Sequence, residues 1–465
     1  MHYVDLKQFQ INARRQIAAG DLGQPLVDVV RLVFSVVDRR TAEGKVFSSP
    51  ELDAICEEVG LATLQYRPPA SIQQSAAEPT VTNLFVATEL YASGGHSRVI
   101  EDFVALSEGQ SCAVVVTNVN NLPEEGIYVE KLLKLGARIL LCPRSLAPIE
   151  KVFWLRHQFS QLSPRRIYYF VHHWDAIAVA AAAVIPKGVG YYFHHGDHNL
   201  ALGVHTPGLI HIDCHTAGFA ICRHELGVKG NKYWPLCTVD HGVRSEHGFL
   251  TRGALTTASS GLPVKFLPTT PYPINYYRLI PNLIGQTRGF HIHFGQIPQA
   301  ILDDLHKDLV SLGIPLERFI HVPWVPSLWK AMSEFGVDVY MNSFPVGGGK
   351  AIVEVMGSGT PAIVHRRGDS AFLGFNFMEY PEAMKWQSGN DLFSVLEACG
   401  RLEWLHEHRL MARKHFDKYH RMDKLAALIR DPDLQLEEAE DQRHPLLLPV
   451  DLQDFLFMEC YKASG

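Results

Sequence analysis

The chain has 465 residues, of which 47% are hydrophobic and 20% are charged, a composition typical of a globular protein with large cores. Its length predicts two or three domains. The formal net charge of −6 argues against nucleic acid or an acidic membrane surface as the main partner.

The sequence carries no signal for a membrane or for an oxidising compartment. The longest apolar run, Ala176–Ile185, is too short to cross a membrane. The N-terminal residues lack the apolar core of a secretory signal peptide. The eight cysteines are scattered without Cys-x-x-Cys pairs, which favours reduced, buried thiols over disulfides or a zinc site. We therefore expect a cytoplasmic protein without an integral membrane segment.

The first 75 residues, 1–75, are predicted to form a small helical region. Apolar side chains between Leu26 and Val36 recur at helical spacing. Ser49 followed by Pro50 is typical of an N-cap and a first helical turn, so a helix is expected to start there. The segment Arg67–Ser71, which contains two prolines, is interpreted as a linker.

From residue 80 the pattern changes to apolar strands that alternate with helices, which predicts a parallel α/β domain over 80–247. The expected strands are Asn83–Thr88, Ala113–Thr117, Ala137–Cys142, Arg166–Val171 and Gly190–His194. The pattern then starts again and predicts a second domain over 248–430. Its expected strands are Val264–Leu267, Gly289–Phe294, Phe319–Val322, Val337–Met341 and Ala362–His365.

The last part of the chain, 431–465, begins with an acidic stretch that is expected to be an exposed loop. The apolar stretch Leu446–Tyr461 is expected to pack back onto the body of the protein. The predicted fold class is α/β, with two Rossmann-like domains and a small N-terminal helical region. Open parallel sheets bind ligands at the carboxyl ends of their strands, so we expect the two domains to face a central cleft.

The clearest functional motif is a glycine loop within Asn342–Arg366. A buried strand leads into Gly347, Gly348 and Gly349, and a helix is expected to begin near Lys350. Glycines let backbone N–H groups approach a ligand closely, and a helix N-terminus favours phosphate. Glu354 lies one helical turn further on, where a carboxylate can bind a ribose diol. An ordinary strand-to-helix turn that binds no phosphate is the alternative.

Further residues of both domains are predicted to bind the donor or the acceptor. Lys265, at the first predicted strand of the second domain, is placed to meet phosphates, although a surface lysine is nearly as good an interpretation. Gln296 follows the next predicted strand and is expected to contact a base or a phosphate. In the first domain, Gly94 and Gly95 precede a helix close to Arg98, a position expected to bind an acceptor or a phosphate.

Histidines form the other candidate site. Seven of the 24 histidines lie between positions 194 and 224, and the densest segment, Phe193–His198, ends a predicted strand. His195, Asp197 and His198 are candidate general bases for an acceptor, with His96 in the first domain as a further candidate. A metal site is a second interpretation, although Phe193 stands where a metallohydrolase pattern needs histidine. The third interpretation is that the histidines only cap loops and helices.

Both motifs resemble a known enzyme family. The segment His194–His205 is similar to the histidine-rich segment of the bacterial adhesin-type glucosyltransferases of glycosyltransferase family 41, which also contains the O-GlcNAc transferases. The segment Asn342–Pro361 resembles the nucleotide-sugar half of that family and of GT-B glycosyltransferases in general. The resemblance implies that Gly348, Gly349 and Lys350 lie at the diphosphate and that Glu354 takes the place of the acidic residue that binds the ribose.

The resemblance also bears on the reaction. Retaining GT-B enzymes of family 4 usually carry a second glutamate eight positions before the one that Glu354 resembles, and this chain has Val346 there. The missing glutamate favours an inverting transferase. The resemblance to metal-independent GT-B transferases implies that no metal ion is needed. We therefore predict an enzyme that moves a hexose from a UDP-sugar to a protein, a glycan or a lipid-linked saccharide, with no cofactor besides that substrate. A metal-dependent hydrolase that uses His194–His198 is the alternative.

Overall fold

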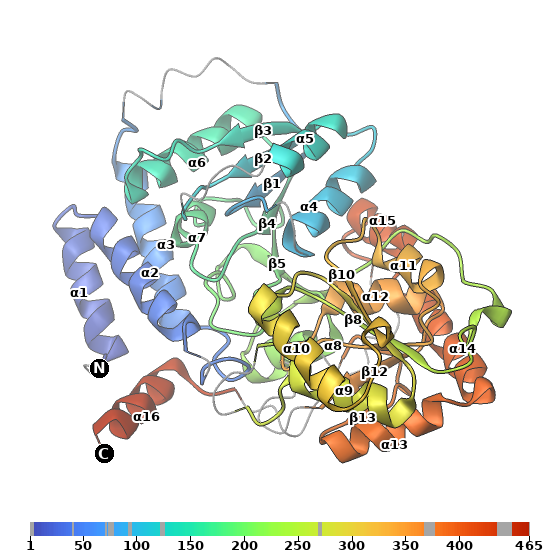
Figure 1. Ribbon diagram of the computed structural model, residues 1–465. Coiled ribbons are helices and arrows are strands. Elements are labelled where there is room, and N and C mark those ends of the chain that lie inside the picture. The colour runs from blue at the N-terminus through green and yellow to red at the C-terminus, as the bar shows by residue number, and fades with distance from the viewer. Residues whose placement is uncertain are drawn as a thin grey trace. The chain divides into compact units, whose positions relative to one another are not determined.

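The computed structural model describes residues 4–39, 41–69, 72, 79–91, 95–120, 126–267, 272–366, 377–434 and 449–464. The chain forms two compact units, which Figure 1 shows as ribbons: Met1–Trp234 together with Leu428–Gly465, and Pro235–Ala427. The second predicted domain begins at residue 248, whereas the second compact unit begins at Pro235. Each unit is built on one parallel β-sheet.

The first unit contains a seven-stranded sheet in the order β3-β2-β1-β4-β5-β6-β7. Strands β1, β2 and β5 are buried along their whole length, since helices cover both faces of such a sheet, and their sequences are correspondingly apolar. The strands are β1 (Asn83–Ala87), β2 (Cys112–Val116), β3 (Arg138–Leu141), β4 (Arg166–Phe170), β5 (Gly190–His194), β6 (Leu209–Asp213) and β7 (Lys232–Tyr233). The five predicted strands are present, whereas β6 and β7 are additional to the prediction.

The N-terminal helices pack against the helices of this sheet. α3 lies so close to α7 that a Cβ on Gly60 would be 2.0 Å from the carbonyl oxygen of Ala180, which only glycine allows. α3 begins as predicted, because Ser49 Oγ accepts a hydrogen bond from Leu52 N at 3.4 Å and Pro50 follows it. The helices are α1 (Leu6–Ala18), α2 (Gly23–Val37), α3 (Pro50–Ala62), η1 (Thr63–Gln65), α4 (Gly95–Leu106), α5 (Gly126–Lys134), α6 (Pro148–Leu162), α7 (Ala176–Ala182), α8 (Thr216–Ala220), η2 (Ile221–Glu225) and α16 (Leu452–Ser464).

The C-terminal helix α16 belongs to the first unit. Leu452, Phe455 and Leu456 are buried in the same core as residues of α1, α2 and α3. Gln453 Oε1 accepts a hydrogen bond from Leu6 N at 2.7 Å, and Figure 1 shows α16 near α1. Burying a large apolar side chain contributes about 1.5–3 kcal/mol, which explains why this apolar end of the chain packs into the unit.

The second unit contains a six-stranded sheet in the order β10-β9-β8-β11-β12-β13. The predicted strand Val264–Leu267 is wrong: the first strand is β8, and Pro263–Lys265 forms a short 3-10 turn after it. β8 consists of threonine, serine and one alanine, all buried, so its sequence lacks the usual apolar signal of a strand. The strands are β8 (Thr256–Ser260), β9 (Phe290–Phe294), β10 (Phe319–Val322), β11 (Val339–Met341), β12 (Ala362–His365) and β13 (Lys385–Trp386).

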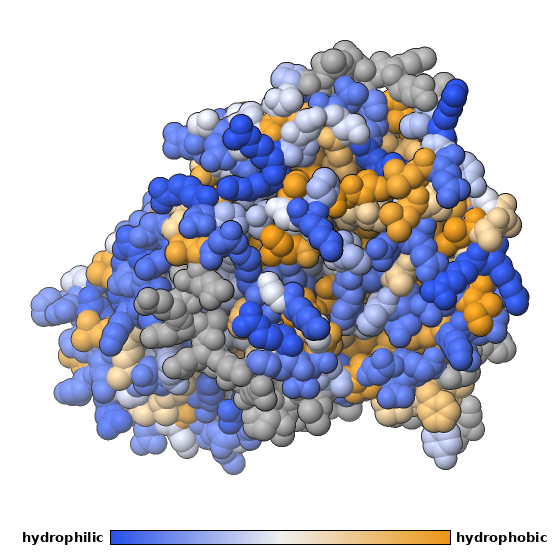
Figure 2. Space-filling view, turned by 180° about the vertical axis from the view of Figure 1, so that it is seen from behind, coloured by the Kyte–Doolittle hydropathy of each residue, from blue (hydrophilic) through white to orange (hydrophobic). Residues whose placement is uncertain are grey.

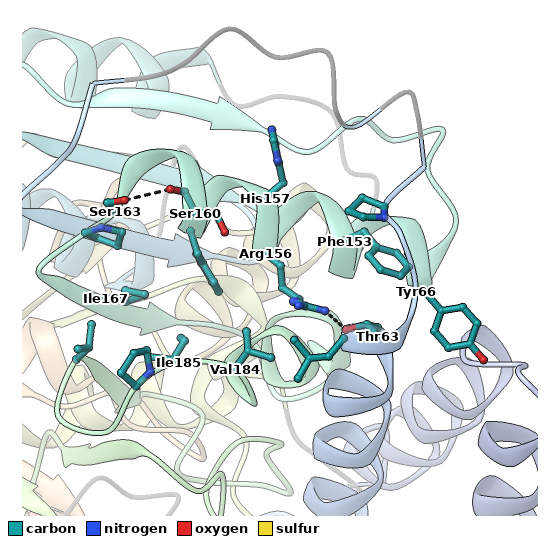
Figure 3. A pocket seen from close by; sticks show the side chains of 16 residues that line it. Thr63, Tyr66, Phe153, Arg156, His157, Ser160, Ser163, Ile167, Val184 and Ile185 are labelled. Atoms are coloured by element: carbon teal, nitrogen blue, oxygen red, sulfur yellow. Dashed lines mark hydrogen bonds between the residues drawn. The ribbon is translucent and has the colours of Figure 1, made fainter.

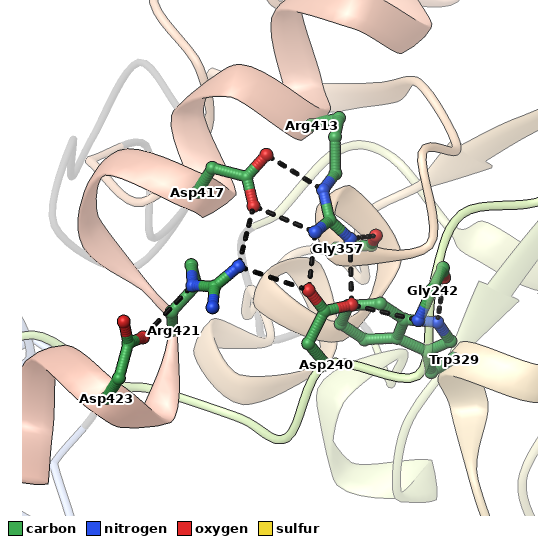
Figure 4. A network of polar contacts seen from close by, with 8 residues as sticks. All are labelled: Asp240, Gly242, Trp329, Gly357, Arg413, Asp417, Arg421 and Asp423. Atoms are coloured by element: carbon green, nitrogen blue, oxygen red, sulfur yellow. Dashed lines mark hydrogen bonds and ion pairs between the residues drawn. The ribbon is translucent and has the colours of Figure 1, made fainter.

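An ion-pair network explains why this unit begins before residue 248 (Figure 4). Arg413 on α14 donates to Asp240 at 2.9 Å and to the carbonyl of Gly357 at 2.8 Å, and Arg421 also pairs with Asp240. The segment around Asp240 is therefore bound by side chains from far along the chain. The helices of the unit are η3 (Glu246–Gly248), η4 (Pro263–Lys265), α9 (Tyr276–Thr287), α10 (Gln299–Ser311), η5 (Leu316–Arg318), α11 (Leu328–Glu334), α12 (Gly349–Gly357), α13 (Gly389–Cys399) and α14 (Leu402–Tyr419), followed by α15 (Met422–Arg430), which runs on into the first unit.

Within the described residues, no helix has both the length and the hydropathy needed to span a membrane. On the face drawn in Figure 2, hydrophobic side chains lie in groups between hydrophilic ones.

Candidate active site

Each sheet has a switch point, where two neighbouring strands continue into connections on opposite faces. In the first sheet it lies between β1 and β4, and in the second between β8 and β11. Ligands of open parallel sheets bind at the carboxyl ends of the strands beside this point, because the loops there diverge. The residues that follow these four strands are therefore the first candidates for a binding site in each unit.

In the second unit, the loops after β8 and β11 are bound to each other. Lys265 follows β8, and its ammonium group donates to Gly347 O at 2.9 Å. Val346 N donates in return to Lys265 O at 3.3 Å. The glycines lead into α12, whose first residue is Gly349. Lys265 thus lies against the predicted phosphate loop, although it lies on a 3-10 turn and not on the predicted strand.

Lys265 is half-buried, and so is the hydrogen bond that its ammonium group donates to Gly347. Burial lowers its pKa to about 8, because the charged form loses its hydration. Among the described residues, it has a backbone carbonyl as partner and no ion pair with a carboxylate. A diphosphate would supply the missing negative charge, so Lys265 is well placed to bind one.

Asn342, directly after β11, shapes the glycine loop. Its Oδ1 accepts hydrogen bonds from Ser343 N and Gly348 N, both at 3.1 Å. One N–H of the loop is therefore already used, which leaves the first turn of α12 as the source of donors for an anion. Asn342 Nδ2 is buried without a hydrogen-bond partner in the described part of the chain. Asn342 is not among the predicted site residues, although it is the first polar residue after a predicted strand.

The predicted ligand residues on α12 also have contacts inside the protein. Lys350 Nζ donates to Cys237 O. Glu354 Oε2 accepts from Trp329 N at 3.3 Å, at the start of α11. Glu354 therefore has a structural contact besides the ribose contact that the resemblance implies. The roles of both residues at the diphosphate and the ribose stay predictions.

Gln296 follows β9, one strand away from the switch point, and its side chain is exposed. The preceding Gly295 packs closely against the loop after β8, where a Cβ would lie 2.2 Å from Gly261 O. This contact holds the two loops together. The predicted contact of Gln296 with a base or a phosphate stays a prediction.

In the first unit, the predicted glycine loop after β1 is described only in part. Gly94 lies outside the described residues, and Gly95 is the first residue of α4. Arg98 pairs with Glu101 at 3.1 Å and lies 3.8 Å from Asp102, both on its own helix. These contacts hold its side chain along α4, so a role of Arg98 in binding phosphate or acceptor gains no support.

Three histidines from separate segments meet at the carboxyl end of the first sheet. The ring centroid of His96 lies 4.3 Å from that of His195 and 4.8 Å from that of His172. His96 is the second residue of α4, whereas His172 and His195 follow β4 and β5. Tyr91 packs onto the group, 5.4 Å from His172. His172 and Tyr91 are not among the predicted site residues, although His172 lies directly after a predicted strand beside the switch point.

These imidazoles are neutral at pH 7 and have unpaired nitrogens. Burial lowers the pKa of His96 to about 4 and that of His172 to about 3, and it also lowers the pKa of His195. His96 Nε2 donates to Phe170 O at 2.9 Å, which leaves Nδ1 as an acceptor. His96 Nδ1, His172 Nε2 and both nitrogens of His195 have no hydrogen-bond partner among the described residues. Buried polar atoms are seldom left unpaired, so the group is suited to bind a polar ligand.

Asp197 and His198 lie next to this group but differ in environment. Asp197 is buried, and its Oδ2 lies 2.5 Å from His215 Nε2. Burial opposes the charge of Asp197, yet His215 and His198 hold the pKa of this carboxyl below its usual range. A carboxylate paired in this way is a poor general base, which argues against that role for Asp197. His198 Nδ1 lies 3.9 Å from Asp197 Oδ1, and 34% of the His198 side chain is exposed.

The segment His194–His198 does not converge on one point. His194 contacts Cys222 and Asp213, at 3.6 Å each, whereas Asp197 contacts His215. His195 belongs to the ring group of His96. Because these side chains diverge, the structure gives no support to a hydrolase whose metal is held by this segment.

A buried aspartate fixes the loops that carry the histidines. Asp175 accepts hydrogen bonds from Thr88 Oγ1 and Thr117 Oγ1, both at 2.7 Å. It also caps α7 by accepting from Ala178 N at 2.9 Å. Thr88 and Thr117 follow β1 and β2, so one side chain joins the ends of three strands close to the switch point.

A cavity of about 410 Å³ lies elsewhere in the first unit (Figure 3). Ile167 near the start of β4 and Val189 just before β5 line it, together with Tyr66 and Arg156. Because the strands are parallel, this cavity lies at their amino ends, at the edge of the sheet opposite the histidines. None of the predicted site residues lines it.

Comparison with known proteins gives matches only at the level of structure. No protein-family model and no curated protein matches the sequence. HepE from Anabaena, in complex with UDP and glucose, is 12% identical with a TM-score of 0.55, over 76% of this chain and 99% of HepE. The sucrose-phosphate synthase of Thermosynechococcus elongatus is 10% identical with a TM-score of 0.52, over 76% of this chain and 98% of that chain. The lipopolysaccharide outer core galactosyltransferase WaaB is 11% identical with a TM-score of 0.53, over 76% of this chain and 100% of WaaB.

Two parallel sheets, each with a Rossmann-like strand order, account for this similarity. The chain has the GT-B fold. The predicted fold class, two Rossmann-like α/β domains, is confirmed. At such low identities the similarity shows the fold alone, and the narrower resemblance to glycosyltransferase family 41 stays a prediction.

Proposed function

We propose that this GT-B protein transfers a sugar from a UDP-sugar donor to an acceptor. The observation that carries the proposal is the contact between Lys265 and Gly347 at the switch point of the second sheet. It places a half-buried ammonium group next to the N-terminus of α12, and both favour a diphosphate. HepE, which has a similar fold, has been crystallised with UDP and with UDP-glucose, which supports UDP as the nucleotide.

In the proposed donor complex, Lys265, Asn342 Nδ2 and the first-turn N–H groups of α12 bind the diphosphate. Glu354 binds the ribose, as the resemblance to GT-B enzymes implies. Lys265 and the helix N-terminus stabilise the negative charge that develops on UDP as the bond to the sugar breaks. The positive charge at the diphosphate is thus assigned to protein groups, and the proposed step needs no metal ion there.

On the acceptor side, His198 is assigned as the general base and Asp197 as the carboxylate that positions it. The acceptor oxygen or nitrogen attacks the anomeric carbon, its proton passes to His198, and the bond between sugar and UDP breaks. His96 and His172 are weak bases at neutral pH, because a good general base titrates near the working pH. We assign these two, with His195, to hydrogen bonding with the acceptor.

The finer parts of the proposal rest on the sequence. Val346, where retaining family 4 enzymes carry a glutamate, supports inversion. The resemblance of His194–His205 to family 41 supports a hexose as the sugar. The acceptor is a protein, a glycan or a lipid-linked saccharide.

A binding screen followed by product analysis tests this function. Calorimetry with UDP, GDP and ADP is expected to show tightest binding of UDP, and the UDP-sugars are then compared. The best UDP-sugar, incubated without acceptor, is expected to be hydrolysed slowly, and NMR of the first-formed sugar reports whether the anomeric centre inverts. No binding of any nucleotide to the folded protein would refute the proposal.

A further inference from the structure

Four side chains that commonly bind metal ions lie together inside the first unit, and the proposed transfer uses none of them. One ligand atom each of His194, His211, Asp213 and Cys222 lies within 4.8 Å of the others, and all four residues are buried. The sheet register brings three of them together: His194 is paired with Asp213 across β5 and β6, and His211, two residues before Asp213, points to the same face. Cys222 comes from the π-helical turn η2.

Three of the six separations between these ligand atoms are close to those of a tetrahedral site, and none of the six exceeds 4.8 Å. Cys222 Sγ lies 3.6 Å from His194 Nδ1, and Asp213 Oδ1 lies 3.6 Å from His194 Nδ1 and 3.1 Å from His211 Nε2. With metal–ligand bonds of about 2.0–2.3 Å, neighbouring ligand atoms of a tetrahedral zinc site are roughly 3.3–3.8 Å apart. Because no two of the four atoms are more than 4.8 Å apart, side-chain movements on the order of 1 Å complete the geometry.

Hydrogen bonding leaves only one oxygen of Asp213 free to bind the metal, so Asp213 would be a monodentate ligand. Its Oδ2 accepts a hydrogen bond from Asn231 Nδ2 at 2.7 Å, while Oδ1 faces the two histidines. Asn231 is itself fixed by Arg223, which donates to Asn231 Oδ1 at 3.0 Å and to its carbonyl at 2.8 Å. Outer hydrogen bonds of this kind orient the ligands of many metal sites. The two imidazole rings pack against Tyr192, at centroid distances of 5.7 Å for His194 and 5.4 Å for His211.

The charges of the group also favour a divalent cation. A buried carboxylate is costly unless a positive charge balances it. When a divalent ion binds, Cys222 releases its thiol proton to water, and the ion, the thiolate and the carboxylate then sum to zero charge. Imidazole and thiolate ligands together select zinc over magnesium or calcium, which prefer oxygen ligands.

We propose that His194, His211, Asp213 and Cys222 bind one zinc ion that joins β5, β6 and η2. Four protein ligands and complete burial leave no open position for a substrate, so the ion is structural and takes no part in the transfer. The inference does not depend on the proposed function, and it departs from the sequence-based expectation of a protein without metal.

The chain offers a matched control for the test. A second buried group, Asp197, Cys214 and His215, also has metal-binding side chains, but it has three members and not four. Cys214→Ser therefore removes a buried thiol from a neighbouring group while the proposed site stays intact. Cys222→Ser removes a thiol from the proposed site.

The test uses the full chain without an affinity tag, purified without added metal. Elemental analysis is expected to find about one zinc per chain in the wild type and in Cys214→Ser, and clearly less in Cys222→Ser. Removal of zinc by a chelator is expected to lower Tm, and added zinc to restore it. Cobalt in place of zinc is expected to give the near-ultraviolet band of a thiolate–cobalt bond in the wild type.

The cobalt spectrum and the zinc content of the wild type decide the question even if Cys222→Ser fails to fold. A wild-type protein that holds no zinc, shows no thiolate–cobalt band and keeps its Tm in chelator would overturn the proposal. The group would then be a hydrogen-bonded cluster in which the histidines alone balance Asp213.

Discussion

The ring of His195, at the end of β5, lies 4.3 Å from the ring of His96, at the start of α4. The two residues come from different motifs of the sequence, and each is a candidate for the acceptor site on separate grounds. They meet because β1, β4 and β5 are neighbours in the sheet, so that the loops after these strands share one edge. Because of this contact, the motif that contains His96 and the segment that contains His195 form one polar group at the carboxyl end of the first sheet.

Lys265→Met is expected to weaken UDP binding at pH 7 and to remove its pH dependence near pH 8. Burial lowers the pKa of Lys265 to about 8 in the free protein, so the cation is lost as the pH rises through that value. Wild-type affinity for UDP should therefore fall between pH 7 and 9, as calorimetry can show. Losing a charge-assisted hydrogen bond costs roughly 1.5–3 kcal/mol. The exposed Lys330→Met is the control, and equal affinities of both variants would contradict the role of Lys265.

Glu354→Ala is expected to weaken UDP binding by about 1.5–3 kcal/mol, because the ribose loses a charged acceptor. Glu354 also accepts a hydrogen bond from Trp329 N, so alanine can act through the fold as well. Glu354→Gln separates the two effects, since an amide oxygen preserves the contact with Trp329 but carries no charge. If Glu354→Gln keeps the Tm and the UDP affinity of the wild type, the carboxylate does not bind the ribose.

His198→Ala is expected to lose transfer by about 10²–10⁴-fold, the usual cost of a missing general base, and to keep its affinity for the UDP-sugar. Asp197→Asn is expected to lower both transfer and Tm, because the carboxylate also pairs with the buried His215 at 2.5 Å. Transfer rates at a saturating donor concentration measure the loss of catalysis, and calorimetry shows whether each variant still binds the UDP-sugar. Wild-type transfer by both variants would show that neither residue is the general base or positions it.

The ring group of His96 is expected to make the protein sensitive to acid. Burial lowers the pKa of His96 from 6.5 to about 4, so between these values the unfolded chain binds a proton that the folded protein does not. The stability due to neutral His96 is complete above pH 6.5 and is lost as the pH falls towards 4. The Tm of His96→Phe should therefore fall less than that of the wild type over this range. Parallel Tm curves for the two proteins would refute this assignment.

Asp240→Asn is expected to lower the free energy of unfolding of the second unit by about 1–2 kcal/mol, because it weakens two arginine contacts (Figure 4). The network is partly exposed, so the effect should shrink at high salt. Asp423→Asn is the matched control: Asp423 pairs with Arg421 at 3.0 Å, and 62% of its side chain is exposed. Equal losses in urea titrations of the two variants would show that Asp240 has no special role.

The sequence alone determined the alternation of strands and helices, because parallel strands buried on both faces are nearly continuous apolar runs. It also located the glycine loop and the histidine segment, since both directly follow such runs. It misplaced the first strand of the second unit, because Thr256–Ser260 is polar although buried. Three of the four hydroxyl groups there have hydrogen-bond partners, as in the bond that Ser259 Oγ donates to Met341 O at 2.9 Å. Thr256 Oγ1 is buried without a partner among the described residues.

Only the tertiary structure decided which polar residues act together. His172 joins His96 because β4 is next to β1, and His211 joins His194 because β6 is next to β5. Both relationships depend on strand order, which no local pattern of residues encodes. The same holds for Asp197, whose partner His215 lies beyond the next strand: its pKa and its availability as a base depend on packing, and packing is a property of the folded chain.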